Sequence, residues 1–450
     1  MKETKFKQTE VGMIPSDWEV KTIGSFCKVY DGTHQTPNYV DFGIPFYSVE
    51  NVSADDFEHT KYISLEEYTQ ISKRANITQG DILMTRIGSI GVCKYVDWNC
   101  KAGFYVSLAL LKCNDRVDAR FICHLSNSEN FKKEIELHSL LTAIPQKINL
   151  GPISDVRIAL PKTIEEQQRI ANALSDVDSL INNLEKLIAK KKNIKQGAMQ
   201  QLLTGKKRLP GFAPDERTGS RPTDERRKEC HSERSAKREV EESSGYKMTE
   251  LGMIPSDWEV KTISQVGKII GGGTPSTFNS AYWNGSVQWF TPAELSKAGK
   301  YVSKSERTIT KLGVENCSAK ILPAGTILLT TRASIGTSAI LKAPACTNQG
   351  FQSLVVNSEN SNEFLYYLLS TKVDEMMSLA SGSTFLEISP KKLGGIQLQI
   401  PSSRAEQTAI ANVLSDMDSE ISALETKLAK YRTLKTGMMQ QLLTGKIRLV

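Results

Sequence analysis

The sequence contains no apolar run near the roughly 18 residues that span a membrane, and its first residues lack a signal peptide's apolar core. Its eight cysteines include no Cys-x-x-Cys pair, and its five histidines are scattered. Neither a zinc site nor a disulfide framework is indicated, so we expect free thiols. These absences predict a cytoplasmic protein without a metal centre.

Short catalytic motifs are also missing. We find no Walker phosphate loop, no Asp/Asn-Pro-Pro-Tyr/Phe methyltransferase string and no Ser/His/Asp set at recognisable spacing. Asp17-x-Glu19-x-Lys21 has the residue types of a nuclease site, but its carboxylates lie too close together in sequence to converge from two strands. We interpret this string as part of a strand that buries Trp18, Val20 and Ile23 on its inner face. The sequence therefore predicts no catalytic residue.

Proline is absent between Thr163 and Thr204, where there is only one glycine, and apolar residues follow steps of four and three. This spacing is typical of a coiled-coil seam. The same pattern returns 240 residues later. The seam residues are Ile170, Leu174, Val177, Ile181, Leu184 and Ile188, then Ile410, Leu414, Met417, Ile421, Leu424 and Leu428. The pattern predicts two helices of about forty residues that pair antiparallel.

A second repeat shows that the chain consists of two modules. Thr9–Ile23 recurs as Thr249–Ile263 with 14 of 15 positions identical, and we call these two segments the frames. The segments between frame and helix, Gly24–Leu160 and Ser264–Ile400, differ and are called the middles. The first has 14 Lys+Arg against 16 Asp+Glu, a net charge of −2, and the second has 12 against 8, a net charge of +4. Matching frames indicate a shared kind of partner, and differing middles indicate different targets.

In combination, the repeated motifs resemble those of the DNA-specificity subunit of type I restriction–modification systems. The motifs are Gly-x-Ile-Pro-x-Asp-Trp-Glu-Val, Gly-x-Ile-Leu…Arg…Ser-Ile-Gly, Pro…Glu-Gln…Ile-Ala and Gln-Gln-Leu-Leu-Thr-Gly, each of them present twice. The resemblance covers essentially the whole chain except a charged linker.

The resemblance implies an α+β fold in which two α/β target recognition domains are joined by two long antiparallel coiled-coil helices in a pseudo-two-fold repeat. The expected boundaries are 1–160 for the first recognition domain, 161–204 for the first helix, 205–248 for the linker, 249–400 for the second recognition domain and 401–450 for the second helix. Each domain would read one half of a bipartite DNA site.

The resemblance also implies partners. Double-stranded DNA, two modification (methyltransferase) subunits and two restriction subunits would assemble with this chain. S-adenosylmethionine, ATP and magnesium would be held by those partners, and this chain would have no cofactor and no catalysis of its own.

Base reading requires polar or cationic side chains on loops that reach a groove. The candidates in the first middle are His34, Gln35, Asn51, Arg86, Ser89, Gln146 and Lys147. Those in the second middle are Thr274, Ser276, Thr291, Arg332, Ser334, Thr384 and Lys391.

Two other functions stay open at this point. The chain could be a coiled-coil scaffold without a DNA role, although two divergent middles would then have no explanation. It could also be a DNA-modifying enzyme whose site the motif search missed.

Overall fold

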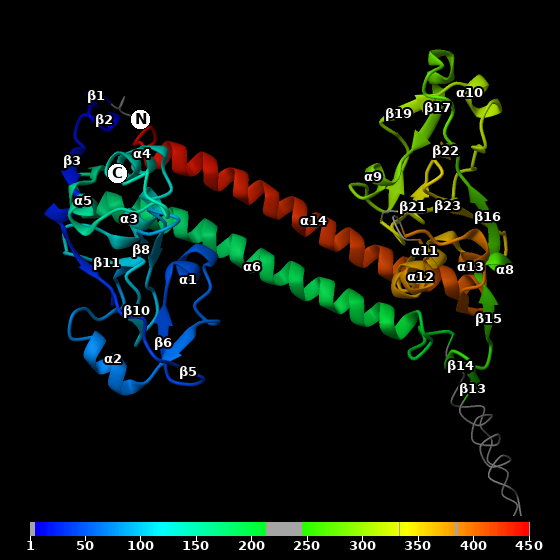
Figure 1. Cartoon of the computed structure of the whole chain (residues 1–450), viewed down its shortest axis with the longest axis horizontal. Helices are drawn as coiled ribbons and strands as arrows, with labels where there is room; N and C mark the ends of the chain where they lie inside the picture. The colour runs from blue at the N-terminus through cyan, green and yellow to red at the C-terminus, as the bar shows by residue number, and fades with distance from the viewer. Residues whose placement is uncertain (1–4, 213–244, 333, 383–385, 450) are drawn as a thin grey trace, which may run out of the picture. The chain divides into compact units, whose positions relative to one another are not determined.

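A computed structural model describes residues 5–212, 245–332, 334–382 and 386–449 of the chain (Figure 1). The chain divides into two compact units: unit 1 comprises Met1–Leu187 with Leu424–Val450, and unit 2 comprises Ile188–Ala423. Most of the expected linker, residues 213–244, lies outside the described residues. In the described ranges, no helix is both long and apolar enough to cross a membrane.

The two long helices are present as predicted. Helix α6 spans Ile164–Leu202 and α14 spans Arg404–Leu442, each 39 residues long. All six predicted seam residues of α6 are buried, with Ile170 and Leu174 fully so. The helices run antiparallel within each unit. Along the ion pairs that join them, the residue numbers increase in α6 while those of the partners decrease in α14. These pairs are Asp178 with Lys435 and Glu185 with Arg432 in unit 1, and Lys191 with Glu420 and Lys195 with Asp418 in unit 2.

Unit 1 is built from two four-stranded sheets and two short strand pairs. The first sheet has the order β4-β11-β8-β9, from Cys27–Asp31, Leu108–Cys113, Ile82–Thr85 and Cys93–Tyr95, and the second has the order β10-β6-β7-β5, from Gly103–Phe104, Ile44–Tyr47, Lys61–Ile63 and Tyr39–Val40. The pairs are β1 (Phe6–Thr9) with β2 (Gly12–Pro15) and β3 (Glu19–Thr22) with β12 (Arg157–Leu160). The shorter helices are η1 (Ile23–Ser25), α1 (Val49–Ala54), α2 (Leu65–Ile71), α3 (Ala119–Leu125), α4 (Glu129–Leu137) and α5 (Leu150–Asp155).

Unit 2 repeats this plan with one strand more in its first sheet. That sheet has the order β16-β23-β20-β21-β18, from Gly267–Gly271, Gln352–Val356, Ile327–Leu329, Ser338–Leu341 and Tyr301–Val302. The second sheet is β19-β17-β22, from Arg307–Ile309, Trp283–Phe290 and Ala345–Thr347. The pairs are β13 (Tyr246–Thr249) with β14 (Gly252–Pro255) and β15 (Trp258–Thr262) with β24 (Gln397–Pro401). The shorter helices are α8 (Ile263–Val266), η2 (Ser280–Tyr282), α9 (Pro292–Leu295), α10 (Lys311–Glu315), α11 (Asn362–Ser370), α12 (Val373–Leu379) and α13 (Pro390–Gly394).

Helical spacing predicts one helix over Ala119–Leu140 and one over Phe364–Leu379. Each stretch divides in two, and a polar cap accounts for the division in unit 1. The Asp118 carboxylate accepts hydrogen bonds from the first turn of α3, and Ser128 caps α4 just after it. Ser361 caps α11 in unit 2 in the same way. Such caps satisfy backbone N–H groups that have no partner within the helix. Helical spacing alone did not reveal the break between α3 and α4.

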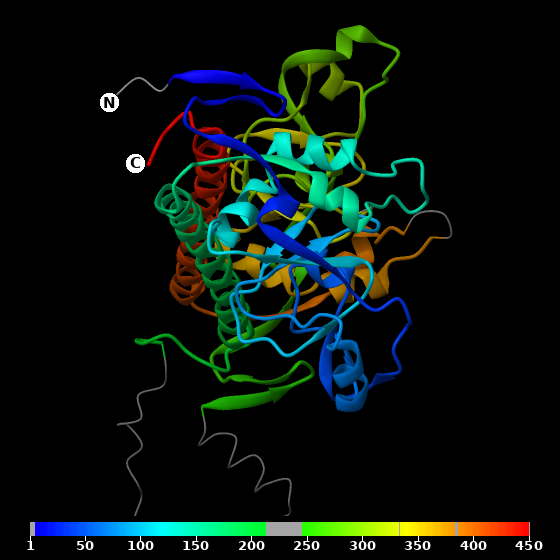
Figure 2. The same ribbon diagram turned by 90° about the vertical axis from the view of Figure 1, so that its left-hand side faces the viewer.

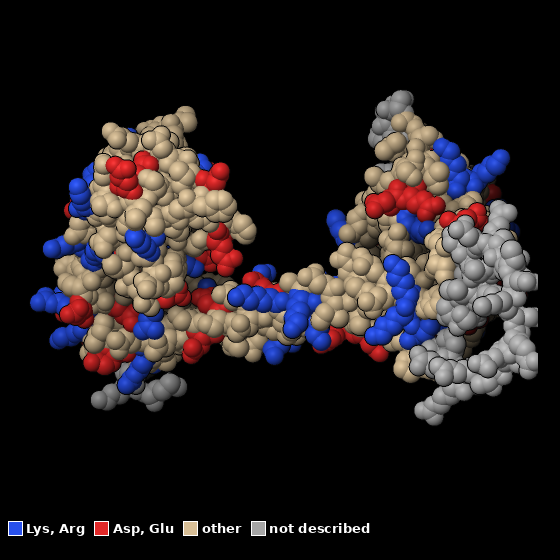
Figure 3. All heavy atoms as spheres, turned by 90° about the horizontal axis from the view of Figure 1, so that it is seen from below, with Lys and Arg blue, Asp and Glu red and all other residues tan. Residues whose placement is uncertain are grey.

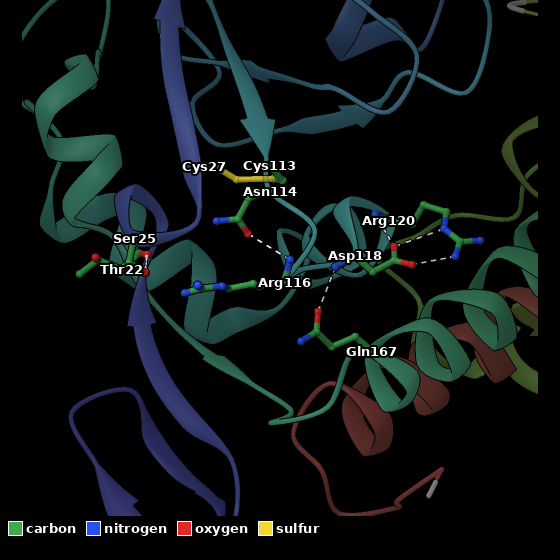
Figure 4. The surroundings of a disulfide bond; sticks show 9 residues. All are labelled: Thr22, Ser25, Cys27, Cys113, Asn114, Arg116, Asp118, Arg120 and Gln167. Carbon is green, nitrogen blue, oxygen red and sulfur yellow. Dashed lines mark hydrogen bonds and ion pairs between the residues drawn. A yellow bond between two sulfur atoms is a disulfide. The ribbon is translucent and has the colours of Figure 1, made fainter.

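The expectation of free cysteines is wrong for one pair. Cys27 and Cys113 form a disulfide, with their Cα atoms 4.0 Å apart (Figure 4). They lie directly opposite each other on the antiparallel strands β4 and β11. Sequence spacing could not show this pairing, because 86 residues separate the two cysteines and only the strand register brings them together.

Each frame is completed by the tail of the other module's helix. In unit 1, the Arg448 guanidinium donates two hydrogen bonds to the Asp17 carboxylate, both 2.8 Å long, and further ones to Glu166. Glu166 opens α6, and its side chain is only 3% exposed. Hydrogen bonding from Arg448 holds the pKa of Asp17 below its ordinary value. We call this set of three side chains a clasp.

Unit 2 contains the same clasp. Arg208 donates to Asp257 through two hydrogen bonds of 2.9 Å, and it also pairs with Glu406, which is 1% exposed. The acidic residue that resembled part of a nuclease site is thus the frame's binding group for an arginine in both modules. Its neighbour Glu19 pairs with Lys21 on the strand surface.

A glycine in each tail lets the chain pass directly over the frame. Gly445 has a φ of +67°, and an added Cβ would lie 2.3 Å from Cγ of Pro15. Gly205 has a φ of +70°, and its Cβ would lie 2.5 Å from Cδ of Pro255. Both the left-handed backbone and the close approach require glycine. Figure 2 shows the C-terminal tail beside the first strands of unit 1.

The tails also complete the cores. Leu442 and Leu443 are buried in one cluster with the frame's Trp18, and Leu202 and Leu203 are buried with Trp258. The repeated Gln-Gln-Leu-Leu-Thr-Gly motif is therefore the point at which each long helix ends and docks on the opposite module's frame.

We predict that Arg448→Met destabilises unit 1 by about 3 kcal/mol, because it leaves the buried Glu166 without a charge partner. Hydrogen exchange should accelerate in residues 6–22 but not in residues 246–262. Arg208→Met should give the reverse pattern.

Arg432→Met is the matched control for this prediction. Its ion pair with Glu185 is exposed, at 62% and 43% for the two side chains, so the loss should stay below about 1 kcal/mol. Equal effects of Arg432→Met and Arg448→Met would contradict the role given to the clasp.

Candidate nucleic-acid interface

In unit 1, three loops that carry predicted site residues meet around the end of strand β4. Arg86, after β8, accepts the N–H of Ile148 on its backbone carbonyl at 2.9 Å, and the N–H of Gly88 donates to the carbonyl of Gln146 at 2.9 Å. Lys147 forms bridges with Ile87 and with Leu140. The loop after β8 and the loop before α5 are thus joined along their backbones.

The Arg86 side chain lies inside this junction. It is only 8% exposed, and its guanidinium donates to Oδ1 of Asp31 at 2.6 Å and to the carbonyl oxygen of Ile148 at 3.2 Å. His34 pairs with the other oxygen of Asp31 through Nε2 at 2.7 Å. Asp31 therefore links the loop after β4 to the other two loops, and Arg86 holds the junction together.

The remaining predicted residues of unit 1 divide by exposure. Asn51, predicted to be a reader on a loop, is instead buried in α1, where its side chain accepts the N–H of Ser48 and donates to the carbonyl of Asp56. Its polar atoms are therefore used within the fold. His34 is 60% exposed at its side chain, and Gln35, Ser89, Gln146 and Lys147 are exposed. The hydroxyl of Ser89 also bonds to that of Ser53 in α1.

Unit 2 places its counterparts on the same loops but gives them other bonds. Thr274, after β16, donates through its hydroxyl to Gln349. Thr291 caps α9 by bonding Glu294 through both its backbone N–H and its hydroxyl, each 2.7 Å from the carboxylate. Ser276 is exposed, and its carbonyl accepts the indole N–H of Trp283 at 3.1 Å.

Arg332 lies at the position in unit 2 that corresponds to Arg86 in unit 1, but its surroundings differ. Its side chain is 42% exposed and pairs with Glu387, on the loop that corresponds to the Gln146 loop of unit 1. Ser334 follows in the same turn. Lys391 is exposed on α13, which packs on α8 and α12. Thr384 lies outside the described residues. The same backbone position therefore holds a buried arginine in one unit and an accessible one in the other.

The two middles do not share a basic net charge, since the first has −2 and the second +4. In Figure 3, basic and acidic side chains are intermixed on the visible faces of both units. In the parts of the chain that the structure describes, no three His, Cys, Asp or Glu side chains gather as a candidate metal site. The loops are therefore distinguished by their geometry and chemistry rather than by a basic patch.

Sequence reasoning overlooked the residues that organise the loops. Asp31, Gln349 and Glu387 each anchor a predicted site residue, yet none belongs to a recognisable motif. The available signal for Asp31 was its position as the first polar residue after a strand. Gln167, in the repeated Glu-Gln motif, accepts the N–H of Asp118 at 3.0 Å and so secures the start of α3.

Comparisons with known proteins agree on one family. The family described as type I restriction modification DNA specificity domain matches residues 15–196 and again residues 255–430. The MjaIX specificity subunit of Methanocaldococcus jannaschii is 44% identical over 179 residues, which are 39% of this chain and 41% of that protein. The putative MjaX specificity subunit of the same organism is 29% identical over 464 residues, covering 99% of this chain and 97% of that protein.

A solved structure shares the fold. The S subunit of a type I restriction-modification system from M. genitalium aligns with a TM-score of 0.57 at 16% identity, over 98% of each chain.

We predict that Arg86→Met lowers the free energy of unfolding by about 3 kcal/mol, because Asp31 would stay buried without its main cation. Arg332→Met should cost less than about 1 kcal/mol, because its ion pair with Glu387 is partly exposed. Urea denaturation of both variants measures the difference. Equal losses would show that Arg86 does not hold the loop junction.

Proposed function

The chain belongs to the family of type I restriction modification DNA specificity domains, and we propose that it selects the DNA site of such a complex, with each unit reading one half of a bipartite sequence. The observation that carries this proposal is one scaffold, present twice, with different side chains on equivalent loops. The buried Arg86 of unit 1, paired with Asp31, corresponds to the partly exposed Arg332 of unit 2, paired with Glu387. Different loop chemistry suits an asymmetric target.

The proposed DNA face consists of the exposed candidates on these loops. In unit 1 they are His34, Gln35, Ser89, Gln146 and Lys147, and in unit 2 they are Thr274, Ser276 and Lys391, to which we add the half-buried Arg332 and Ser334. Arg86, Asn51 and Thr291 support the loops from within, because their polar atoms are already bonded to the protein. Thr384, outside the described residues, stays a sequence prediction.

The repeated surfaces suit the modification subunits. In unit 1, a hollow of about 750 Å³ lies between the β1–β2 hairpin, α4 and the end of α14. Its lining includes Met13, Thr444 and Lys446, and the identical residues Met253, Thr204 and Lys206 line a hollow of about 470 Å³ in unit 2. Two like hollows favour two copies of one partner. We propose that one modification subunit docks at each.

Catalysis and cofactors then belong to the partners. The modification subunits would hold S-adenosylmethionine and methylate adenine, and two restriction subunits would use ATP and magnesium to cut DNA. This chain would contribute site selection and assembly alone.

Replacing Ser264–Ile400 with the equivalent middle of a relative tests the proposal. The exchange should alter one half of the methylated sequence and preserve the other, and methylome sequencing of cells carrying the chimera reports both. Replacing Gly24–Leu160 is the matched control and should alter only the opposite half. A chimera in which both halves change, or neither does, would refute the assignment of one unit to each half-site.

A further inference from the structure

Of the three most exposed large apolar side chains of the described residues, two lie on loops that carry candidate readers. Phe278 is 100% exposed, Ile144 is 99% exposed and Phe42 is 92% exposed, while the next such side chain, Leu137, is 73% exposed. Scattered exposed leucines are ordinary on protein surfaces. Complete exposure of a phenylalanine and an isoleucine on loops that carry the candidate readers calls for a partner surface.

Ile144 projects from a loop whose base is fixed. The N–H of Leu140 donates to the carbonyl of Lys147 at 2.8 Å, which closes the loop beneath its tip. The N–H of Gly88 then joins this loop to the loop after β8 through Gln146. The tip therefore holds an apolar side chain two positions before Gln146, an exposed candidate reader.

Phe278 lies on a different loop of unit 2, the one after β16, and this loop is also anchored on both sides. The indole N–H groups of Trp289 and Trp283 donate to the carbonyls of Gly273 and Ser276, at 2.9 and 3.1 Å. Asn279, just after Phe278, caps η2 through its side chain. Phe278 thus stands free between two anchored stretches, two positions after the candidate reader Ser276.

We propose that Ile144 and Phe278 are apolar wedges, each inserted at a base step of the half-site that its own unit reads. This inference rests on the proposed function and adds the contact by which the loops engage the bases. Proteins that insert apolar side chains between base pairs partly unstack the step and kink the duplex. Such a contact suits the first middle, whose net charge of −2 offers little attraction for phosphates.

The anchored loop bases also favour a wedge over a mobile contact. A side chain on a preordered loop loses less conformational freedom on binding than one on a flexible loop. Unstacking differs in cost between base steps, so a wedge contributes to sequence selection without hydrogen-bonding a base.

The test uses the full chain assembled with its modification subunits, and DNA carrying the site found by methylome sequencing. 2-Aminopurine is placed singly along each half-site, at positions other than the methylated adenine. Its fluorescence rises when its neighbours unstack. The wild-type complex should brighten one step in each half-site.

Phe278→Ala should abolish the signal in its own half-site, keep the signal in the other and weaken binding about tenfold. The slope of log affinity against log salt should stay unchanged, since no phosphate contact is lost. Phe278→Trp should restore the signal. Ile144→Ala should act in the same way on the opposite half-site.

Phe42→Ala supplies the matched control. Phe42 is nearly as exposed but lies in the turn between β5 and β6, which carries no candidate reader, so its removal should leave both signals intact. Wedge insertion would be refuted if Phe278→Ala kept its signal, if Phe42→Ala abolished the signal that Ile144→Ala abolishes, or if Phe278→Ala instead released the modification subunits.

Two further outcomes complete the test. Phe278→Ala should leave the melting temperature unchanged, because the side chain makes no contacts in the fold; a lower value would overturn the proposal. Failure of the wild-type complex to bind the methylated site would overturn the proposed function together with the wedge. Specific binding without any brightened step would overturn the wedge alone.

Discussion

An arginine held between an exposed aspartate and a buried glutamate is the interaction on which each unit depends. Glu166 and Glu406 are almost fully buried, so each needs its arginine, and that arginine comes from the tail of the other module's helix. The tail leucines enter the same core as the frame's tryptophan. Neither module can therefore complete its own frame, and the two must fold as one chain.

This dependence explains which parts of the chain repeat and which differ. The frame, the start of the long helix and the tail contact one another through the ion pairs of the clasp. The tail glycine also packs directly on a proline of the frame. A change in one of these parts therefore requires changes in the others. The hydrogen bonds of the clasp involve none of the candidate readers on the loops. The arginine after β8 pairs with Asp31 at the end of β4, whereas its counterpart Arg332 pairs with Glu387 on another loop, so equivalent arginines connect different loops in the two units.

The sequence predicted the features that are local or repeated. The steps of four and three specified both long helices, because a seam of that spacing can only be buried by another helix. Features that depend on strand register or on contacts between residues distant in sequence could not be predicted. Cys27 meets Cys113 through strand pairing, Asn51 turns inward as the cap of α1, and Arg86 is buried because Asp31 arrives from a distant strand. Residue type marked such positions as candidates, but it did not show which partners surround each side chain in the fold.

Net charge and loop structure would contribute differently to DNA binding. Phosphate attraction provides affinity regardless of sequence, and it grows with the number of cations that face the DNA. Here the basic and acidic side chains are intermixed, and the first middle is net acidic (Figure 3). The chain as a whole has a net charge of +7 and the second middle one of +4, so attraction to phosphates would come from parts of the chain other than the first middle. In unit 1, the anchored loops rather than net charge would then determine where the chain binds on the duplex.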